Sequence, residues 1–197
     1  MLNAALVAAT SMGAQQLTTR FFENFDTVPH QMVNSHTLTG PVANWNDTAA
    51  LWVSPNQSYH ANVVVGDTLF TRTFAFSTQG ARYVKLTFDH IAKFALMQQG
   101  QIQVSINNGL TWNKLGSAQY EGGSNFKTTT YFNEMSYSNS AQAIFWGGPN
   151  AVNPTNSWWA HEEFDLSDIA GKGPTGASNG FSQVLVRFAL QYRYPIL

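Results

Sequence analysis

Alternating apolar and polar residues mark three stretches of the chain most clearly. Val84, Leu86 and Phe88 are each separated by a polar residue, and the same period of two recurs over 101–106 and 184–190. Successive side chains of a strand point to opposite faces, so this period predicts strands with one buried face. Residues 184–190 are mostly apolar at the intervening positions too, which favours a central strand covered on both faces.

A turn signal follows the second of these stretches. Asn108-Gly109 is a strong short hairpin sequence, because both residues tolerate positive φ. It predicts a hairpin of 101–106 with 110–115. The further predicted strands are 19–26, 49–53, 61–65, 68–76, 129–132, 142–146 and 158–165.

Glycine, proline and asparagine gather in two stretches, 147–157 and 171–180. These are predicted to be loops within one module, because predicted strands lie on both sides of each. Helical turns are expected near 166–170 or 91–97. Short strands joined by such turns predict an all-β fold, and we expect a jelly-roll-like antiparallel β-sandwich of about ten strands over residues 17–197.

The first sixteen residues differ from the rest of the chain. Leu2 to Ala9 is an apolar run, and small residues at 11–14 precede Gln15, although no Lys or Arg occurs before Arg20. An apolar run followed by small residues is typical of a signal peptide, so we expect residues 1–16 to be a signal peptide or its remnant. The alternative is an ordinary first helix or strand. The run is too short to span a bilayer, and no membrane span is expected.

Composition narrows the classes of protein further. Apolar residues make up 44% of the chain, which excludes a disordered protein, while charged residues make up only 11%, against roughly 25% in ordinary domains. The net charge is −1, and no basic stripe exists for nucleic acid. The chain has no cysteine, which fits an exported bacterial protein better than a secreted eukaryotic one. We therefore expect a secreted or cell-surface location.

Several motifs occur in an order that resembles a known family. They are Phe21-Phe22-Glu23-Asn24-Phe25-Asp26, the stretch 86–93, the hairpin 103–112, Trp158-Trp159 followed by 163–167, and Val186-Arg187-Phe188. In this order they resemble the jelly-roll modules of exported Bacteroidota proteins, many of them carried by the type IX secretion system. The resemblance implies a surface-associated β-sandwich that is usually one part of a longer adhesin or hydrolase. It implies no fixed ligand, and further domains after Leu197 are left open.

One acidic motif bears on catalysis. Glu163, Asp165 and Asp168 resemble the Glu-x-Asp-x-x-Glu signature of a retaining glycosidase family with a sandwich fold, in which two carboxyls lie about 5–5.5 Å apart. In a regular strand, however, Glu163 and Asp165 share one face and Asp168 falls on the other. The alternative is a strand that ends in an Asp-Leu-Ser turn. We expect no catalytic residues, and a glycoside hydrolase using Glu163 and Asp168 is kept as an alternative.

Acidic residues on the predicted strands 19–26 and 158–165 suggest a metal-binding site. Glu23, Asp26 and Asp165 lie on these two segments, and Ca²⁺ prefers carboxylate and carbonyl oxygens. They are the predicted ligands of a structural calcium ion. The alternative is that they cap turns or face water.

Aromatic and polar residues suggest a binding site. Trp146, Trp158 and Trp159 flank the loop 147–157, where they could stack on sugar rings, although two adjacent Trp can also be core residues. Asp89 and His90 end the central strand and either bind a ligand or lock a loop by hydrogen bonds. The sequence thus predicts a non-catalytic binding or display module whose partner is a glycan or a surface protein. A hydrolase and a purely structural spacer are the alternatives.

Overall fold

The computed structural model describes residues 2–10, 16–38, 44–53, 56–94, 97–137, 154–171 and 179–192. Most regular structure in these residues is strand. The elements are β1 (Leu2–Thr10), β2 (Gln16–Glu23), β3 (Met32–His36), β4 (Asn46–Thr48), β5 (Ser58–His60), β6 (Thr68–Thr73), β7 (Tyr83–His90), β8 (Gln98–Ser105), β9 (Asn113–Lys114), α1 (Phe126–Thr129), η2 (Asn156–Trp158), β10 (Ala160–Asp165), α3 (Ser167–Ala170) and β11 (Leu185–Tyr192).

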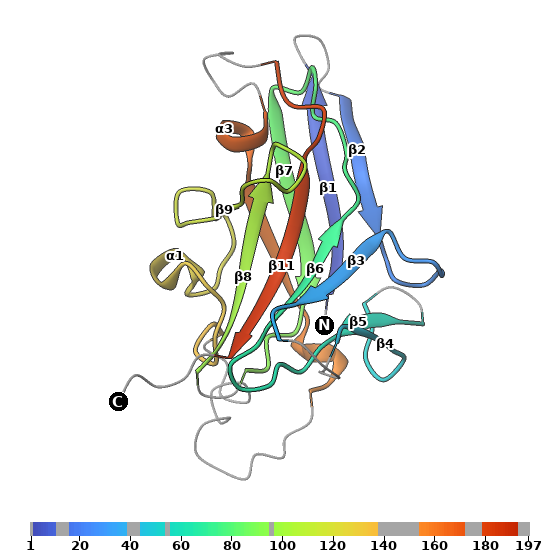
Figure 1. Cartoon of the computed structure of the whole chain (residues 1–197), viewed down its shortest axis with the longest axis vertical. Helices are drawn as coiled ribbons and strands as arrows, with labels where there is room; N and C mark the ends of the chain where they lie inside the picture. Colours follow the sequence, from blue (N-terminus) through green and yellow to red (C-terminus); the bar gives the residue numbers. More distant parts are fainter. Residues whose placement is uncertain are drawn as a thin grey trace.

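The strands form two antiparallel sheets that face each other (Figure 1). The first has the order β10-β7-β1-β5-β4, with β2 also paired to β1, and the second has the order β3-β6-β11-β8-β9. The rings of Phe88 on β7 and Phe188 on β11 lie 5.1 Å apart, so the two sheets share one core. The predicted all-β antiparallel sandwich is confirmed.

The predicted alternation holds along the central strands. Burial alternates residue by residue along β6 and β7, with Val84, Leu86 and Phe88 turned into the core. Fully burying a side chain of this size stabilises the fold by about 1.5–3 kcal/mol. On β11, Leu185 and Ala189 on the outer face are buried as well, which confirms that this central strand is covered on both sides.

The turn at 107–110 agrees with its sequence, but the hairpin is wider than predicted. Asn108 and Gly109 both have positive φ, of 56° and 86°. The partner strand β9, however, pairs Asn113 and Lys114 with β8, so the connection spans seven residues. The hydroxyl of Ser105 organises this longer loop by accepting hydrogen bonds from the amides of Asn107 and Gly109.

Other predicted strands are displaced. The stretches 49–53 and 61–65 are not strands; the short strands β4 and β5 lie just before them. Val53, Val64 and Val65 are exposed, so these apolar residues do not alternate into the core. The stretch 129–132 contains the end of α1 and a single bridge to β8, and 142–146 lies outside the described residues. The helical turn expected near 166–170 is α3.

Residues 2–10 form strand β1 inside the first sheet. It pairs with β7 over eight residues and with β2 through a register shift between Leu6 and Val7. This is the ordinary strand that the sequence left open as an alternative, and the signal peptide stays a prediction. Among the described residues no helix is both long and apolar enough to cross a bilayer.

A segment that we name the edge strap, residues 119–137, runs along one side of the sandwich. Next to β10, the amide of Glu121 donates to the carbonyl of Glu163 at 2.9 Å, and the amide of Asp165 donates to the carbonyl of Gln119 at 2.7 Å. Next to β8, Gly100 and Phe132 exchange two backbone hydrogen bonds of 2.8 and 2.7 Å. The strap therefore covers the edge of β10 and joins the two sheets.

Candidate functional site

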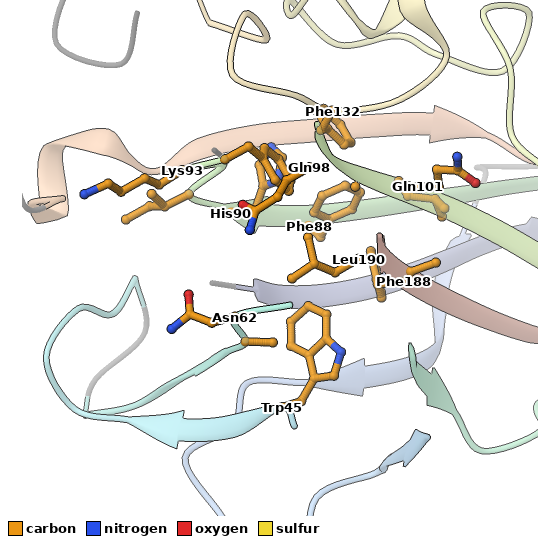
Figure 2. Close-up of a pocket in the computed structure, with 16 residues that line it drawn as sticks. Trp45, Asn62, Phe88, His90, Lys93, Gln98, Gln101, Phe132, Phe188 and Leu190 are labelled. Atoms are coloured by element: carbon orange, nitrogen blue, oxygen red, sulfur yellow. The ribbon is translucent and has the colours of Figure 1, made fainter. Parts of the chain in front are cut away.

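A cavity of about 90 Å³ lies between the sheets, where β7 and β11 finish and β8 begins (Figure 2). Its inner wall is apolar and comes from both sheets: Phe88 from β7, Ile102 from β8, and Phe188 and Leu190 from β11. Phe132 of the edge strap adds a further ring. The cavity is thus an opening at one end of the hydrophobic core.

The mouth of the cavity is polar. Asn62 and Lys93 line it and are exposed, and Gln98 is half-buried. A ligand would pass these polar residues before its inner part reached the rings. An apolar interior with a few polar groups at the entrance is the usual make-up of a small-ligand site.

Trp45 forms the floor of the cavity in Figure 2 and is held by a stack of rings. Tyr59 lies between Trp45 and Phe25, with ring centroids 5.9 Å and 4.9 Å away and nearly parallel planes. The amide of Asn34 donates to the Tyr59 hydroxyl. These contacts fix the Trp45 ring in one position before any ligand arrives.

His90 lies in the cavity wall and is connected to the strap. Its ring packs edge-on against Phe132, with centroids 4.4 Å apart, and its Nε2 contacts the hydroxyl of Tyr137. The same nitrogen is 3.6 Å from Oε1 of Glu162. Burial lowers the pKa of His90, although the Glu162 carboxylate partly opposes this. His90 is therefore neutral at neutral pH.

Glu162 is a buried carboxylate behind His90, with only 1% of its surface exposed. The hydroxyls of Tyr120 and Tyr137 donate to it at 2.6 and 2.5 Å. Burial by itself raises the pKa of Glu162, but the hydrogen-bond donors around it, His90 and the two tyrosine hydroxyls, outweigh this and leave it lowered. The group is thus an ionised carboxylate whose charge is stabilised by donors.

The tyrosines remain protonated. Burial and the neighbouring Glu162 raise the pKa of Tyr120 to about 12, and burial raises the pKa of Tyr137 further. Gly122 makes room for this cluster, since a Cβ at that position would lie 2.4 Å from Oε2 of Glu162. Together these contacts attach the strap to β10 and β7, so the loop-locking role expected for the end of the central strand falls to His90.

Asp89 lies on the other side of the sheet from His90. Its Oδ1 is 2.9 Å from Nδ1 of His161 on the outer face of β10. The outer face continues with Glu163, whose carboxylate is 3.5 Å from Nε2 of His161 and 2.9 Å from the ammonium of Lys85. The two predicted ligand-binding residues at the end of β7 are therefore not brought together.

The predicted tryptophan platform is not formed by the described residues. Trp158 is buried within η2, Trp159 is half-buried just before β10, and Trp146 lies outside the described residues. The two adjacent rings are not on a strand as expected, because β10 begins at Ala160.

The acids of the glycosidase alternative lie on different elements. Glu163 is on the outer face of β10, while Asp168 is exposed in the first turn of α3. The hydrogen bond from Lys85 lowers the pKa of Glu163. A general acid of a glycosidase requires a raised pKa, so this geometry gives the alternative no support.

The three predicted calcium ligands are also apart. Strands β1 and β7 lie between β2, which carries Glu23, and β10, which carries Asp165. Glu23 accepts hydrogen bonds from the amides of Phe25 and Gln31 at 2.7 and 2.5 Å. Asp26 and Asp165 likewise accept hydrogen bonds from backbone amides. In the described part of the chain, no three His, Asp or Glu side chains are grouped to hold a metal ion.

Sequence reasoning missed Glu162, Tyr120, Tyr137 and Trp45. A signal for Glu162 existed, because it has the same parity as Phe164 and Leu166, which are apolar residues of the same stretch. The tyrosines belong to an irregular segment with no periodic pattern, and only the fold brings them to β10.

The architecture defines the class of protein as an antiparallel β-sandwich with a cavity at one end of its core. Comparisons with protein-family profiles, with curated proteins and with solved structures found no match for this chain.

Proposed function

We propose that this protein is a non-catalytic binding module of an exported bacterial surface protein, and that it holds part of its partner in the end cavity. The observation that carries the proposal is the cavity itself, with aromatic and aliphatic inner walls and a polar mouth. Its walls are held in place by the Trp45 ring stack and by the hydrogen bonds of Glu162. A site of this kind binds without having to rearrange first.

The carboxylates near the cavity argue for binding rather than catalysis. Glu162 has both oxygens occupied by tyrosine hydroxyls, and Glu163 is paired with Lys85 on the outer face. Low charge, absence of cysteine and the resemblance to exported modules support the surface location.

A ligand screen with a blocked cavity tests this function. Neutral oligosaccharides and peptides with aromatic residues are added to the full chain, and thermal stabilisation is measured. Ala61 lines the cavity and is half-buried, so Ala61→Leu fills it; Ala50 is exposed outside the cavity, so Ala50→Leu is the matched control. We expect a stabilisation that Ala61→Leu abolishes and Ala50→Leu preserves. No stabilisation by either class, or one that both variants preserve, would overturn the proposal and favour a structural spacer.

A further inference from the structure

The hydrogen bonds around Glu162 determine which nitrogen of His90 carries the proton. An ionised carboxylate only accepts, so the hydroxyls of Tyr120 and Tyr137 both donate to it. Tyr137 has a single proton, and its oxygen can therefore only accept from Nε2 of His90. In a neutral imidazole the other nitrogen, Nδ1, is then an acceptor.

This acceptor belongs to a side chain of the cavity wall (Figure 2). Gln101 is a second buried polar residue of the lining, but its amide already donates to Gln191 at 3.1 Å. Because the ring of His90 lines the cavity and its Nε2 is engaged by Tyr137, Nδ1 is the ring atom left to accept from a group that enters beside the apolar walls. The matching ligand has one donor on an otherwise apolar body.

The apolar wall restricts the ligand further. The inner surface formed by Ile102, Phe188 and Leu190 offers no partner for the several hydroxyls of a sugar ring, and a charged group would lose its hydration there. An apolar cavity of about 150 Å³ holds a benzene ring. This cavity has about 90 Å³, so a single ring enters with part of it in the mouth, and a two-ring group is too large.

From these observations we infer that the cavity takes a phenolic ring, the side chain of a tyrosine on a partner protein, and that Nδ1 of His90 accepts its hydroxyl proton in a hydrogen bond. The inference rests on the proposed binding function and names its ligand. The polar mouth, with Asn62 and Lys93, faces the peptide that carries the ring.

A titration with small probes tests the inference on the full chain. p-Cresol, which is the tyrosine side chain without its backbone, is compared with toluene, which lacks only the hydroxyl, and with 3-methylindole, which has two rings. Binding is followed by methyl NMR signals of Ile102 and Leu190. We expect p-cresol to shift both signals and to bind about fivefold more tightly than toluene, the factor that one neutral hydrogen bond provides. 3-Methylindole should cause no shift.

Two variants and a control separate the possible results. His90→Phe should remove the advantage of p-cresol over toluene, and Ala61→Leu should weaken both, while Ala50→Leu changes neither. Equal binding of p-cresol and toluene by the wild type overturns the hydrogen bond to His90 but leaves the cavity as a binding site. No shift with any probe overturns the phenolic ligand, and the proposed function is then judged separately by the oligosaccharide arm of the thermal screen.

Discussion

Glu162 and Glu163 are neighbours in the sequence and lie on opposite faces of β10. Glu162 is 1% exposed and accepts from two tyrosines, whereas the side chain of Glu163 is 37% exposed and pairs with Lys85. Identical side chains therefore have different roles, one inside a buried network and one on the surface. Strand geometry alone assigns these roles, because successive residues alternate between faces.

A substitution at each position measures the difference. Glu162→Gln keeps the shape of the side chain but replaces one acceptor by an NH₂ donor, so one tyrosine hydroxyl loses its partner. We expect a loss of about 1–3 kcal/mol in the free energy of unfolding, measured with urea. Glu163→Gln removes an exposed ion pair and should cost less than about 1 kcal/mol. Equal losses in the two variants would contradict the buried network.

The same network predicts a dependence of stability on pH. Burial lowers the pKa of His90 below its ordinary 6.5, so the unfolded chain takes up a proton at a higher pH than the folded protein does. This contribution to stability is present above pH 6.5 and is lost as the pH falls from 6.5 towards the lowered value. Glu162, whose pKa is lowered from 4.5, adds a second loss below pH 4.5.

Urea unfolding at pH 7.5, 5.5 and 4.0 measures these steps. His90→Phe should be less sensitive than the wild type between pH 7.5 and 5.5, because it lacks the group that titrates there. Glu162→Gln should be less sensitive between pH 5.5 and 4.0. A variant that follows the wild-type dependence through its own interval would show that the residue does not titrate as described.

At this scale the sequence predicted part of the site. It singled out His90, since a polar residue that ends an apolar strand is conspicuous. The acidic motif drew attention to Glu163, kept only as part of an alternative, while the parity that Glu162 shares with Phe164 and Leu166 was not used. Trp45 and Asn62 could not be found, since they lie in irregular segments next to β4 and β5 and reach the cavity only in the folded protein.

Among the elements, strands were predictable where one face packs on the core. Along β7 and β11, apolar residues alternate because the opposing sheet covers every second side chain. Around β4 and β5 the strands have three residues each, too few for a period, and their apolar neighbours Val64 and Val65 are exposed. The strands predicted at 49–53 and 61–65 are therefore wrong, because these stretches are apolar in sequence but are mostly exposed in the fold.

The 107–110 turn yields a prediction at this scale. Gly109 has φ of +86°, in the left-handed region that a side chain disfavours. Gly109→Ala should therefore reduce the free energy of unfolding by about 1–2 kcal/mol. Gly123 is exposed with open space around it, and Gly123→Ala is the control, with an expected change below about 0.5 kcal/mol. A Gly109→Ala variant as stable as the control would contradict the strained turn.

Strand β11 carries a second prediction on its outer face. The guanidinium of Arg187 lies between the rings of Phe70 and Trp112, 4.3 and 4.0 Å from their centroids, and its Nε donates to Gln103 at 2.6 Å. Lysine has no planar group to stack, so Arg187→Lys should cost about 1 kcal/mol and alter Trp112 fluorescence.

Arg72→Lys on the neighbouring strand is the control for this substitution. Its guanidinium donates to the carbonyl of Thr73 at 3.4 Å, a long hydrogen bond that contributes little. Unchanged stability and fluorescence in Arg187→Lys would show that the stacking does not hold the outer face together.

At the scale of the whole molecule, the expected signal peptide leads to a prediction about strand β1. Protein recovered from the surface of a Bacteroidota host should begin at Gln15, because the small residues 11–14 form the expected cleavage site. Mass spectrometry of the N-terminal peptide measures this. Cleavage would remove the strand between β7 and β2, and both would then need another partner. Surface protein that retains residues 2–10 would contradict the signal peptide and keep β1 in the sheet.

The position of the cavity has a practical consequence for binding measurements. Leu2 pairs with His90, and β11 finishes two residues after Leu190, so both ends of the described chain lie beside the cavity. Attachment of the uncleaved chain at Leu2, or of any form at Tyr192, turns the mouth towards the sensor surface and hinders a protein partner. The 107–110 turn is at the opposite end of β8, Leu110 is 84% exposed, and the chain has no cysteine. Leu110→Cys therefore provides one thiol through which the molecule can be attached with its cavity facing the solution.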